Sequence, residues 1–488
     1  MDENKKKEKD NKILKKVIKI KKTKKTKKVG KNWRKPWKLG EEEFNTQYFD
    51  VNSNGEMIVK EGYYQYNIMD IVKKYGTSTE IFFPYILEHR VRDLLELFNA
   101  YIKISNYKGK FFYHYVMKSN QNRDFVLPAI AEGAHIEVSS ANELFLVKRM
   151  LESDKFNRKI RVTCNGPKTD QYISLVEELH GKGLIVIPVI ENAHELERLK
   201  KFKGEVGVRV NLDVKIDAHW DKKYNHFGFD EEELIKIGKI RNLSMLHYHI
   251  STQNEKIEGF IKPLKRAIAL YAKMREHNPA LDTVNFGGGM AVPYEKRKKM
   301  ISVKNLVNQM VKTAKKESDK LGVKHPNLVC EWGSYFTAPS QISVFKVLEQ
   351  KSITNKSDTK WYFIDGSFIT NLTDTWSVVR HKWHFAPANH LNARRLQKVW
   401  LAGSTCDADD RYTASGNYVL LPKINEDVSD LYLVVFDTGS YQYTLSNNHC
   451  LLSKPAMVVC QNGEVKLSRK RQTADDLGKL FGWNGDHK

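Results

Sequence analysis

Between residues 111 and 330 the chain alternates short apolar runs with segments of helical spacing, and no other feature limits the possible folds as strongly. The eight strand-like runs are Phe111–Met117, His135–Val138, Ile160–Cys164, Leu184–Val189, Val206–Leu212, Met245–Ile250, Thr283–Phe286 and Leu328–Cys330. The seven helical segments between them are Asp124–Ala131, Ala141–Leu151, Asp170–Leu179, His194–Phe202, Glu231–Ile237, Ile257–His277 and Val303–Leu321. This alternation predicts an α/β fold, a parallel (β/α)8 barrel. An open, doubly wound sheet is the competing fold, because a count of strands does not prove that the sheet closes.

The sequence changes character after about Ser340. Further strand-like runs are joined there by loops with little helix: Val344–Leu348, Lys360–Ile364, Val399–Ala402, Tyr418–Pro422, Leu431–Phe436 and Ala456–Cys460. They predict a C-terminal, mostly antiparallel β domain, which the runs within Gln47–Lys60 are expected to join. We therefore expect a barrel over residues 85–339 and a β domain built from residues 41–84 and 340–488.

Residues 1–40 differ from the rest of the chain in charge. Residues 1–38 hold 18 Lys and Arg against 4 Asp and Glu, which is +14 of the net charge of +23. A segment with this much charge can bury little apolar area, so it is expected to be a disordered basic tail. It could bind nucleic acid or an anionic lipid surface, but a solvated extension without a dedicated partner is the commoner case.

The remaining composition is that of a globular protein, with 41% hydrophobic residues. The longest apolar runs, such as Leu184–Ile190, are too short to span a bilayer, and no secretory signal is evident at the N-terminus. Five cysteines are scattered without the spacing of a metal site: Cys164, Cys330, Cys406, Cys450 and Cys460. This usage is typical of reduced thiols and predicts a cytoplasmic protein without a bound metal or a membrane partner.

Polar groups fall at or near the C-terminal ends of the expected barrel strands, where the active sites of such barrels lie. In chain order they are Lys118, Glu137, Arg209, His249, the triplet Gly287-Gly288-Gly289 and Glu331. Taken alone, Lys118 could be a solvated lysine and His249 a histidine of the core. Their shared position favours a common site.

The chemistry of these groups indicates what the site would bind. Lys118 can form an imine with a carbonyl cofactor, and glycine backbone N–H groups can approach a phosphate because no side chain intervenes. Glu331 follows the apolar run Leu328–Cys330 and needs a partner, since an unpaired buried charge is costly. A pyridinium nitrogen is such a partner, so the set predicts a site for pyridoxal 5'-phosphate.

Six motifs extend this pattern along the chain. They are Tyr115-Val116-Met117-Lys118-Ser119-Asn120, Ile136-Glu137-Val138-Ser139-Ser140 with Glu143, His249-Ile250-Ser251-Thr252-Gln253, Asn285-Phe286-Gly287-Gly288-Gly289, Thr405-Cys406-Asp407-Ala408-Asp409-Asp410 and Asp437-Thr438-Gly439-Ser440-Tyr441. In this order the chain resembles the fold type III (alanine racemase-like) pyridoxal phosphate-dependent decarboxylases, and most of all the biosynthetic arginine decarboxylases. The resemblance runs from about Phe44 to Pro455.

The resemblance implies a role for each matching barrel residue. Lys118 would bind the cofactor covalently and later release it to the amine of the substrate. His249 would stack on the cofactor ring, and Glu331 would keep the ring nitrogen protonated. Glu137 and Arg209 match an acid and an arginine that the family places near the cofactor.

The phosphate of the cofactor would be held by the glycine triplet Gly287, Gly288 and Gly289 with Thr252, and Tyr441 would reach it from the β domain. One position departs from the family pattern. Many relatives have the pattern Glu-x-Gly-Arg after strand eight, and its arginine helps to bind phosphate. Here the stretch reads Glu331-Trp332-Gly333-Ser334. Ser334 can donate a hydrogen bond but brings no charge, so the phosphate would depend more on the glycines.

The resemblance also implies a homodimer or a higher oligomer with shared active sites. Cys406 and Asp407 match residues that cross the dimer interface, where the cysteine assists protonation and the aspartate binds the distal cation of the substrate. The implied reaction is decarboxylation of a basic amino acid, above all of L-arginine to agmatine and CO2 in polyamine biosynthesis. An ornithine, lysine or diaminopimelate decarboxylase is the alternative, and a catalytically inactive regulatory homologue is a further one.

Overall fold

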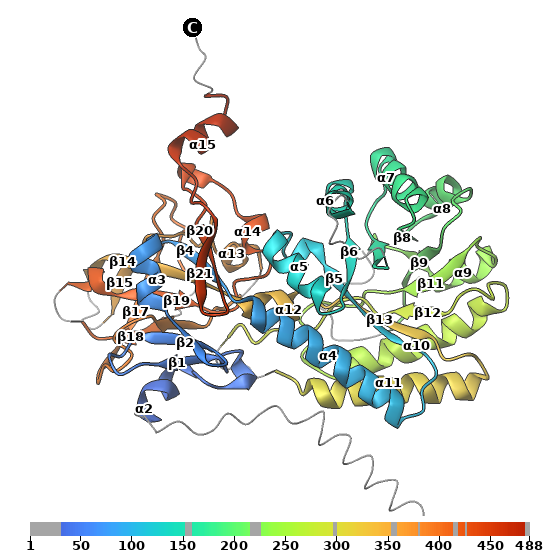
Figure 1. The fold of residues 1–488 in the computed structure, drawn as a ribbon, viewed down its shortest axis with the longest axis horizontal. Helices are drawn as coiled ribbons and strands as arrows, with labels where there is room; N and C mark the ends of the chain where they lie inside the picture. Colours follow the sequence, from blue (N-terminus) through green and yellow to red (C-terminus); the bar gives the residue numbers. More distant parts are fainter. Residues whose placement is uncertain are drawn as a thin grey trace, which may run out of the picture. The chain divides into compact units, whose positions relative to one another are not determined.

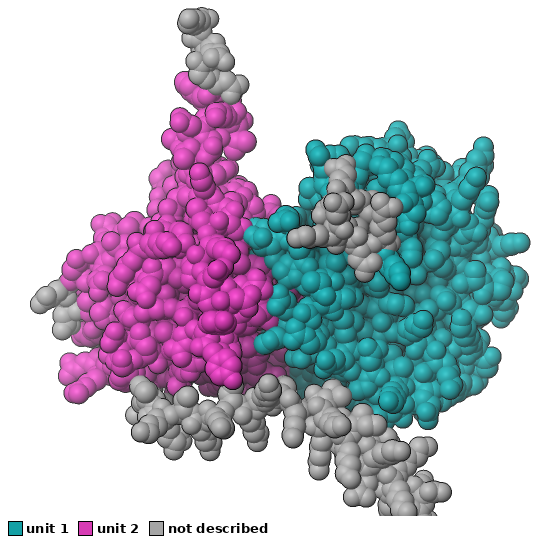
Figure 2. Space-filling model, viewed as in Figure 1, with its two compact units in different colours: residues 1–24, 88–291, 301–335 teal, residues 25–87, 292–300, 336–488 magenta. Residues whose placement is uncertain are grey.

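A computed structural model of the chain describes residues 31–151, 159–214, 226–295, 300–352, 359–378, 381–412, 418–424 and 427–483. The chain forms two compact units, which have different colours in Figure 2. Unit 1 comprises residues 1–24, 88–291 and 301–335, and unit 2 comprises residues 25–87, 292–300 and 336–488.

Residues 1–30 of the expected basic tail (residues 1–40) lie outside the described residues. The described part of the chain begins with the short helix α2 (Lys31–Arg34). Trp37 and Leu39 are buried in the hydrophobic core of unit 2. Burial of these two apolar side chains is favourable enough to order a stretch whose neighbours are mostly charged.

Eight parallel strands form the centre of unit 1. They are β5 (Phe111–Val116), β6 (His135–Val138), β7 (Arg161–Cys164), β8 (Ile185–Ile190), β9 (Val206–Asn211), β11 (Leu243–His247), β12 (Thr283–Asn285) and β13 (Asn327–Cys330), and the short β10 (Phe229–Asp230) pairs beside β9. Each strand pairs with the next, and the pairings of β8 with β9 and of β13 with β5 close the ring. The predicted (β/α)8 barrel is therefore confirmed, and the open doubly wound sheet is excluded.

Helices follow the strands and lie around the outside of the barrel (Figure 1). They are α5 (Arg123–Ala131), α6 (Ala141–Leu151), α7 (Asp170–Gly181), α8 (Ala193–Leu199), α9 (Glu231–Ile237), α10 (Glu258–Arg275) and α11 (Val303–Leu321). Asn122, Thr169 and Ser302 each accept a backbone N–H at the start of α5, α7 and α11. Such caps stabilise a helix by about 1 kcal/mol each, which explains why these helices begin where they do.

One long helix that was not predicted, α4 (Pro84–Ile104), precedes β5. Its buried apolar side chains Val91, Leu94 and Phe98 recur at helical spacing. Phe98 stacks on Phe111 of β5 with the ring centroids 3.6 Å apart. The helical pattern is present in the sequence, but it precedes the alternation of strands and helices on which the prediction was based.

Unit 2 is built mostly from antiparallel strands, as predicted. A nine-stranded sheet contains β4 (Thr79–Phe82), β14 (Gln341–Ser352), β15 (Lys360–Ile364), β16 (Phe385–Pro387), β17 (Leu396–Ala402), β18 (Val419–Pro422), β19 (Tyr432–Val435), β20 (Ala456–Gln461) and β21 (Glu464–Arg469). The runs within Gln47–Lys60 form β1 (Phe49–Val51) and β2 (Met57–Glu61), which make a separate three-stranded sheet with β3 (Tyr64–Asn67). The early strand that enters the large sheet is instead β4, which pairs with β14 and β20.

The interior of the barrel is packed with side chains. Ile187, Met245 and Val329 form a buried cluster inside it, and Phe112 and Ile185 pack against this cluster. The space within the strands is therefore a packed core, so a ligand site is expected at an end of the barrel. In the part of the chain that the structure describes, no helix has the length and apolar character required to cross a membrane.

Candidate active site

Lys118 lies in the short 3-10 turn Met117–Ser119 that directly follows β5. The turn is anchored because Met117 and Ser119 are buried and the Ser119 hydroxyl donates to the Val116 carbonyl at 2.7 Å. The Lys118 side chain is 47% exposed, and its Nζ lies 3.4 Å from both carboxylate oxygens of Glu137. The amine is thus fixed at the C-terminal end of the barrel while part of it stays accessible.

Glu137 lies in β6 and is completely buried. Its Oε1 accepts hydrogen bonds from Ser139 Oγ at 2.7 Å and from Asn165 Nδ2 at 2.9 Å. Burial raises the pKa of Glu137, and the neighbouring ammonium of Lys118 acts in the opposite direction. The Glu137 carboxyl group is therefore suited to take up a proton within the site.

Glu331 is the first residue after β13, and it is surrounded by donors. Asn285 Nδ2 donates to its Oε1 at 2.6 Å and Asn165 Nδ2 donates to its Oε2 at 3.1 Å. His247 Nε2 lies 3.3 Å from the same Oε2, a close contact in which the ring is not aligned for a hydrogen bond. Burial favours the neutral acid, but His247, Lys118 and Asn285 outweigh it and hold the pKa of Glu331 well below its ordinary value.

One amide group joins the two acids. Asn165 Nδ2 donates to Glu137 and to Glu331, although these residues lie 28 and 166 positions away in the chain. The barrel thereby brings two carboxyl groups together whose pKa values are moved in opposite directions. Such a pair is typical of a functional site, because one group can stay charged while the other exchanges a proton.

The glycine triplet after β12 leaves no room for side chains. A Cβ at Gly287 would lie 2.6 Å from the Tyr248 carbonyl oxygen, and one at Gly289 would lie 2.7 Å from that of Ser251. Both residues also have positive φ, +66° and +109°, a conformation that glycine adopts at little cost. The Gly287 N–H donates to Asn285 Oδ1 at 2.9 Å, so Asn285 connects the triplet to Glu331.

Thr252 lies in the loop that follows β11, and this loop runs beside the triplet. The Asn254 N–H donates to the Gly289 carbonyl at 2.8 Å, and Ser251 lies directly against Gly289. A hydroxyl and a stretch of backbone without side chains therefore lie at one place on the barrel end. Backbone without side chains lets a phosphate group such as that of the implied cofactor approach closely, although the Gly287 and Gly288 N–H groups donate to Asn285 and His249.

His249 lies two residues beyond the end of β11, because the strand stops earlier than its apolar pattern predicts. Its Nδ1 accepts the Gly288 N–H at 3.0 Å, which fixes the orientation of the ring. Burial, together with the cations Arg209 and Lys118, lowers the pKa of His249 to about 3. The imidazole is therefore neutral at physiological pH and suited to lie against an aromatic ring.

Arg209 lies in β9, and Glu191 holds its guanidinium group. Its Nη1 lies 3.2 Å from Glu191 Oε1, and its Cζ lies over the Phe227 ring at 4.3 Å from the centroid. The positive charge of Arg209 contributes to the lowered pKa of His249. The Arg209 guanidinium group itself is held by Glu191 and Phe227. Arg209 thus belongs to the same end of the barrel as the other predicted residues.

Three of the residues singled out from the sequence lie in unit 2. Cys406 and Asp407 are exposed in the loop between β17 and β18. Buried Asp410 shapes this loop, since its carboxylate accepts the Thr405 hydroxyl at 2.7 Å and the Phe368 N–H at 2.7 Å. Tyr441 precedes α14 (Gln442–Leu445).

The structure therefore brings the predicted barrel residues together at one end of unit 1, and it brings Cys406 and Asp407 together in unit 2. The roles of all these residues stay predictions. No role was predicted for Asn165, which follows β7, or for His247 and Asn285, which end β11 and β12. Their place at strand ends is the same signal that identified Lys118 and Glu331, so the same rule could have found them.

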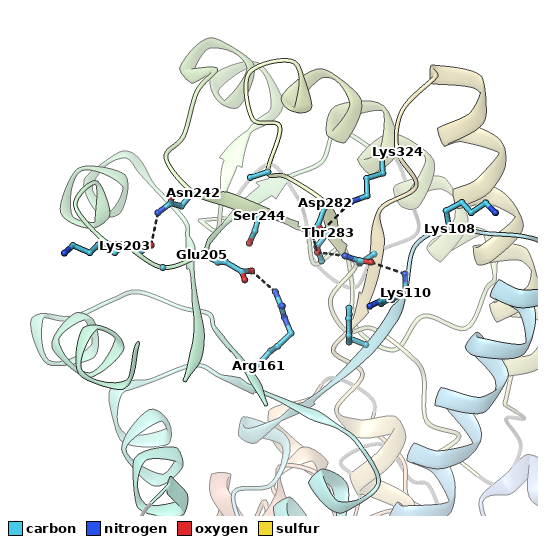
Figure 3. A pocket seen from close by; sticks show the side chains of 14 residues that line it. Lys108, Lys110, Arg161, Lys203, Glu205, Asn242, Ser244, Asp282, Thr283 and Lys324 are labelled. Atoms are coloured by element: carbon cyan, nitrogen blue, oxygen red, sulfur yellow. Dashed lines mark hydrogen bonds and ion pairs between the residues drawn. The ribbon is translucent and has the colours of Figure 1, made fainter. Parts of the chain in front are cut away.

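A pocket of about 700 Å³ opens at the opposite ends of the barrel strands in unit 1 (Figure 3). It is lined by residues that precede or begin strands, including Lys108, Lys110, Arg161, Lys203 and Lys324. Two of its cations are paired there, Arg161 with Glu205 at 2.7 Å and Lys324 with Asp282 at 3.9 Å. None of the predicted site residues lines this pocket. The pocket is therefore separate from the candidate site, which lies at the C-terminal ends of the strands.

Comparison with known proteins identifies the family of the barrel. Residues 92–338, slightly more than half of the chain, match the family described as "Pyridoxal-dependent decarboxylase, pyridoxal binding domain". This stretch includes every barrel residue discussed above.

Two relatives and one solved structure illustrate the range of similarity. A biosynthetic arginine decarboxylase of Phocaeicola vulgatus is 24% identical over 410 residues, which are 75% of this chain and 62% of that protein. A diaminopimelate decarboxylase of Methanocaldococcus jannaschii is 26% identical over 427 residues, 84% of this chain and 92% of that protein. The crystal structure of a biosynthetic arginine decarboxylase from Campylobacter jejuni has a TM-score of 0.78 at 20% identity and covers 91% of this chain and 92% of that one. The chain thus spans less than two thirds of the length of the first of these relatives.

Proposed function

This chain belongs to the pyridoxal-dependent decarboxylases, and from that membership we propose that it removes the α-carboxyl group of a basic amino acid as CO2. L-Arginine is the proposed substrate and agmatine the proposed product, which would be a step of polyamine biosynthesis. The observation that carries the proposal is the hydrogen-bonded series Lys118–Glu137–Asn165–Glu331 at the C-terminal end of the barrel.

The barrel residues would hold the cofactor from several sides. Lys118 would bind its carbonyl carbon, the neutral ring of His249 would lie against its pyridine ring, and the Gly287–Gly289 backbone with Thr252 would hold its phosphate. Tyr441 of unit 2 is proposed as a further phosphate contact. When bound, pyridoxal phosphate supplies an electron-accepting ring that stabilises negative charge at the substrate Cα.

Glu331 would determine how well the ring accepts electrons. Its lowered pKa keeps the carboxylate charged, so it would hold a proton on the ring nitrogen opposite to it. Preorganised charge of this kind usually provides the largest part of a rate enhancement. Glu137 would serve the other end of the site, because it lies 3.4 Å from the Lys118 amine and its raised pKa lets it exchange a proton there.

Recognition of the substrate would fall to the loop that carries Cys406 and Asp407. A carboxylate such as Asp407 can accept two parallel hydrogen bonds from a guanidinium group, a geometry that an ammonium group cannot copy. Cys406 would supply the proton that replaces the departing carboxyl group. We propose that this loop acts in the active site of a second subunit, in a homodimer with shared sites.

A second candidate within the family is decarboxylation of diaminopimelate. The chain covers 92% of the M. jannaschii diaminopimelate decarboxylase but 62% of the P. vulgatus arginine decarboxylase, and this difference in length favours the alternative. A catalytically inactive regulatory homologue is disfavoured, because Lys118, Glu331 and Cys406 are all retained. A cytoplasmic location is proposed from the five cysteines, which are all free thiols.

The test is a substrate panel. The purified chain, loaded with pyridoxal phosphate, is incubated separately with L-arginine, L-ornithine, L-lysine and meso-diaminopimelate, and amines and CO2 are measured, with Lys118→Ala as the inactive control. Agmatine from arginine at the highest kcat/KM supports the proposal. Preferred formation of lysine from diaminopimelate would replace it with the second candidate, and CO2 release from none of the four would contradict both.

A further inference from the structure

Two of the five cysteines lie in contact. Cys406 Sγ and Cys450 Sγ are 3.8 Å apart, although the residues are separated by 44 positions in the chain. Both are exposed, whereas the other three cysteines, Cys164, Cys330 and Cys460, are buried. The two thiols that a dissolved reagent can reach are thus the two that touch each other.

A second contact runs beside the first. His449 Nε2 lies 3.5 Å from Asp407 Oδ2, so two consecutive residues, His449 and Cys450, face the consecutive pair Cys406 and Asp407. All four residues belong to unit 2, and the contacts are therefore internal to one compact unit. Asp410 is buried and fixes the base of the Cys406 loop, so the thiols approach each other from two defined segments.

We propose that Cys406 and Cys450 form a reversible disulfide, a modification site that switches the enzyme off under oxidising conditions. Two thiols in van der Waals contact need a movement of about 1.8 Å to reach the S–S bond length of about 2.05 Å. Both segments are exposed, so this movement displaces no core side chain. The bond would remove the Cys406 thiol and restrain the adjacent Asp407.

The oxidant is a low-molecular-weight disulfide, RSSR. The thiolate of one cysteine attacks RSSR, forming a mixed disulfide and releasing RS⁻. The second cysteine, as thiolate, then attacks the sulfur of the first, which forms the Cys406–Cys450 bond and releases the second RS⁻. The two protein thiols lose two electrons and two protons, and RSSR is reduced to two RSH. The contact favours the second step, because the attacking sulfur is already in place.

The pKa of the Cys406 thiol is raised, chiefly by its contact with Cys450, so the thiol form predominates near neutral pH. Since only the thiolate attacks disulfides, oxidation should become faster as the pH rises. The disulfide itself does not depend on the proposed function, but the loss of activity does, because it rests on the proposed roles of Cys406 and Asp407.

The test uses the purified full-length holoenzyme and glutathione disulfide. After incubation the remaining thiols are alkylated, and intact mass with peptide mapping identifies each cysteine. The expected product has lost two hydrogens, carries no glutathione, and contains a Cys406–Cys450 crosslink that dithiothreitol removes. His449→Ala, which keeps both thiols, should form the same crosslink. Cys450→Ser should keep its basal activity and retain glutathione as a stable adduct on Cys406.

Decarboxylation is measured on the same samples. We expect activity to fall at least tenfold in the crosslinked protein and to return with dithiothreitol. A stable glutathione adduct on the wild-type protein, or a crosslink between two copies of Cys406, would overturn the modification site. A crosslink that leaves activity unchanged would overturn the switch. If the crosslink forms in a protein that decarboxylates no amino acid, the modification site holds and the proposed function fails.

Discussion

His247 and Glu331 place an imidazole nitrogen and a carboxylate oxygen 3.3 Å apart at the end of the barrel, with side chains that are 1% and 5% exposed. Asn165 and Asn285 donate hydrogen bonds to the same acid, so polar groups surround it. A buried carboxylate would otherwise take up a proton, because removing its charge from water is costly. The ionised state of Glu331 is therefore produced by its neighbours.

We expect Asn285→Ala, which removes a hydrogen bond to Glu331, to weaken cofactor binding by about 1.5–3 kcal/mol, roughly 10- to 100-fold, the usual contribution of a hydrogen bond to a charged group. His247→Phe, which removes only a polar contact, should weaken binding in the same direction. The reason is that Glu331 would lose part of its charge and pair less well with the ring nitrogen. The measurement is the dissociation constant of pyridoxal phosphate. The control ligand is an analogue with carbon in place of the ring nitrogen, for which wild type and variants should bind alike. Equal losses for both ligands would indicate a general structural defect instead.

The lowered pKa of His249 predicts a pH dependence of stability. The folded protein holds this group at a pKa of about 3 against an ordinary 6.5, so between these values the unfolded chain binds a proton that the folded protein does not. The contribution of His249 to stability is therefore complete above pH 6.5 and is lost as the pH falls toward 3, by at most about 1.4 kcal/mol per pH unit. Urea unfolding of the cofactor-free wild type and of His249→Gln should show a smaller loss on acidification in the variant. Parallel curves would mean that His249 is not the titrating group.

Lys118→Ala should abolish the absorbance of bound cofactor and the release of CO2. The Lys118 amine lies 3.4 Å from both carboxylate oxygens of Glu137. The variant should keep its fold, since 47% of the side chain is exposed. Absorbance spectra, CO2 measurement and far-UV circular dichroism check the three statements. Residual yellow colour or turnover in a folded variant would refute the assignment.

Cys406→Ala should slow product formation while the cofactor stays bound. Its proposed task is to return a proton to the substrate Cα, so its loss should lower kcat and leave KM for arginine largely unchanged. Steady-state kinetics and the cofactor spectrum provide the measurement, and Cys450→Ser is the matched control. Unchanged kcat in Cys406→Ala would remove the proposed role.

Asp407→Asn should weaken the preference for arginine. Replacing the carboxylate by an amide removes a charge-assisted pair worth about 1.5–3 kcal/mol, so kcat/KM for arginine should fall roughly 10- to 100-fold. Turnover of a substrate with a different distal group should change less. Asp409→Asn is the control, because that neighbouring carboxylate is 80% exposed and lies 3.8 Å from Arg411. The same substrate preference in Asp407→Asn and wild type would exclude the guanidinium contact.

The sequence by itself determined the elements of the barrel and the residues at its strand ends. Apolar periodicity is a local property, so it identified eight strands and seven helices to within a few residues. It also identified Lys118, Glu137, His249 and Glu331 as groups at one end of the barrel, because consecutive parallel strands end on the same side. The helix α4 and the strand β4 were missed, although α4 had a readable pattern.

Only the tertiary structure decided which distant groups meet and what charge they carry. The pairing of β8 with β9 closes the sheet, and Asn165 joins Glu137 to Glu331 across 28 and 166 residues. A linear pattern contains no information on such distances. The same holds for the pKa values of the two acids, which move in opposite directions because burial acts on both while the donors gather around one. The physical reason is that ionisation depends on neighbours in space, and folding alone selects them.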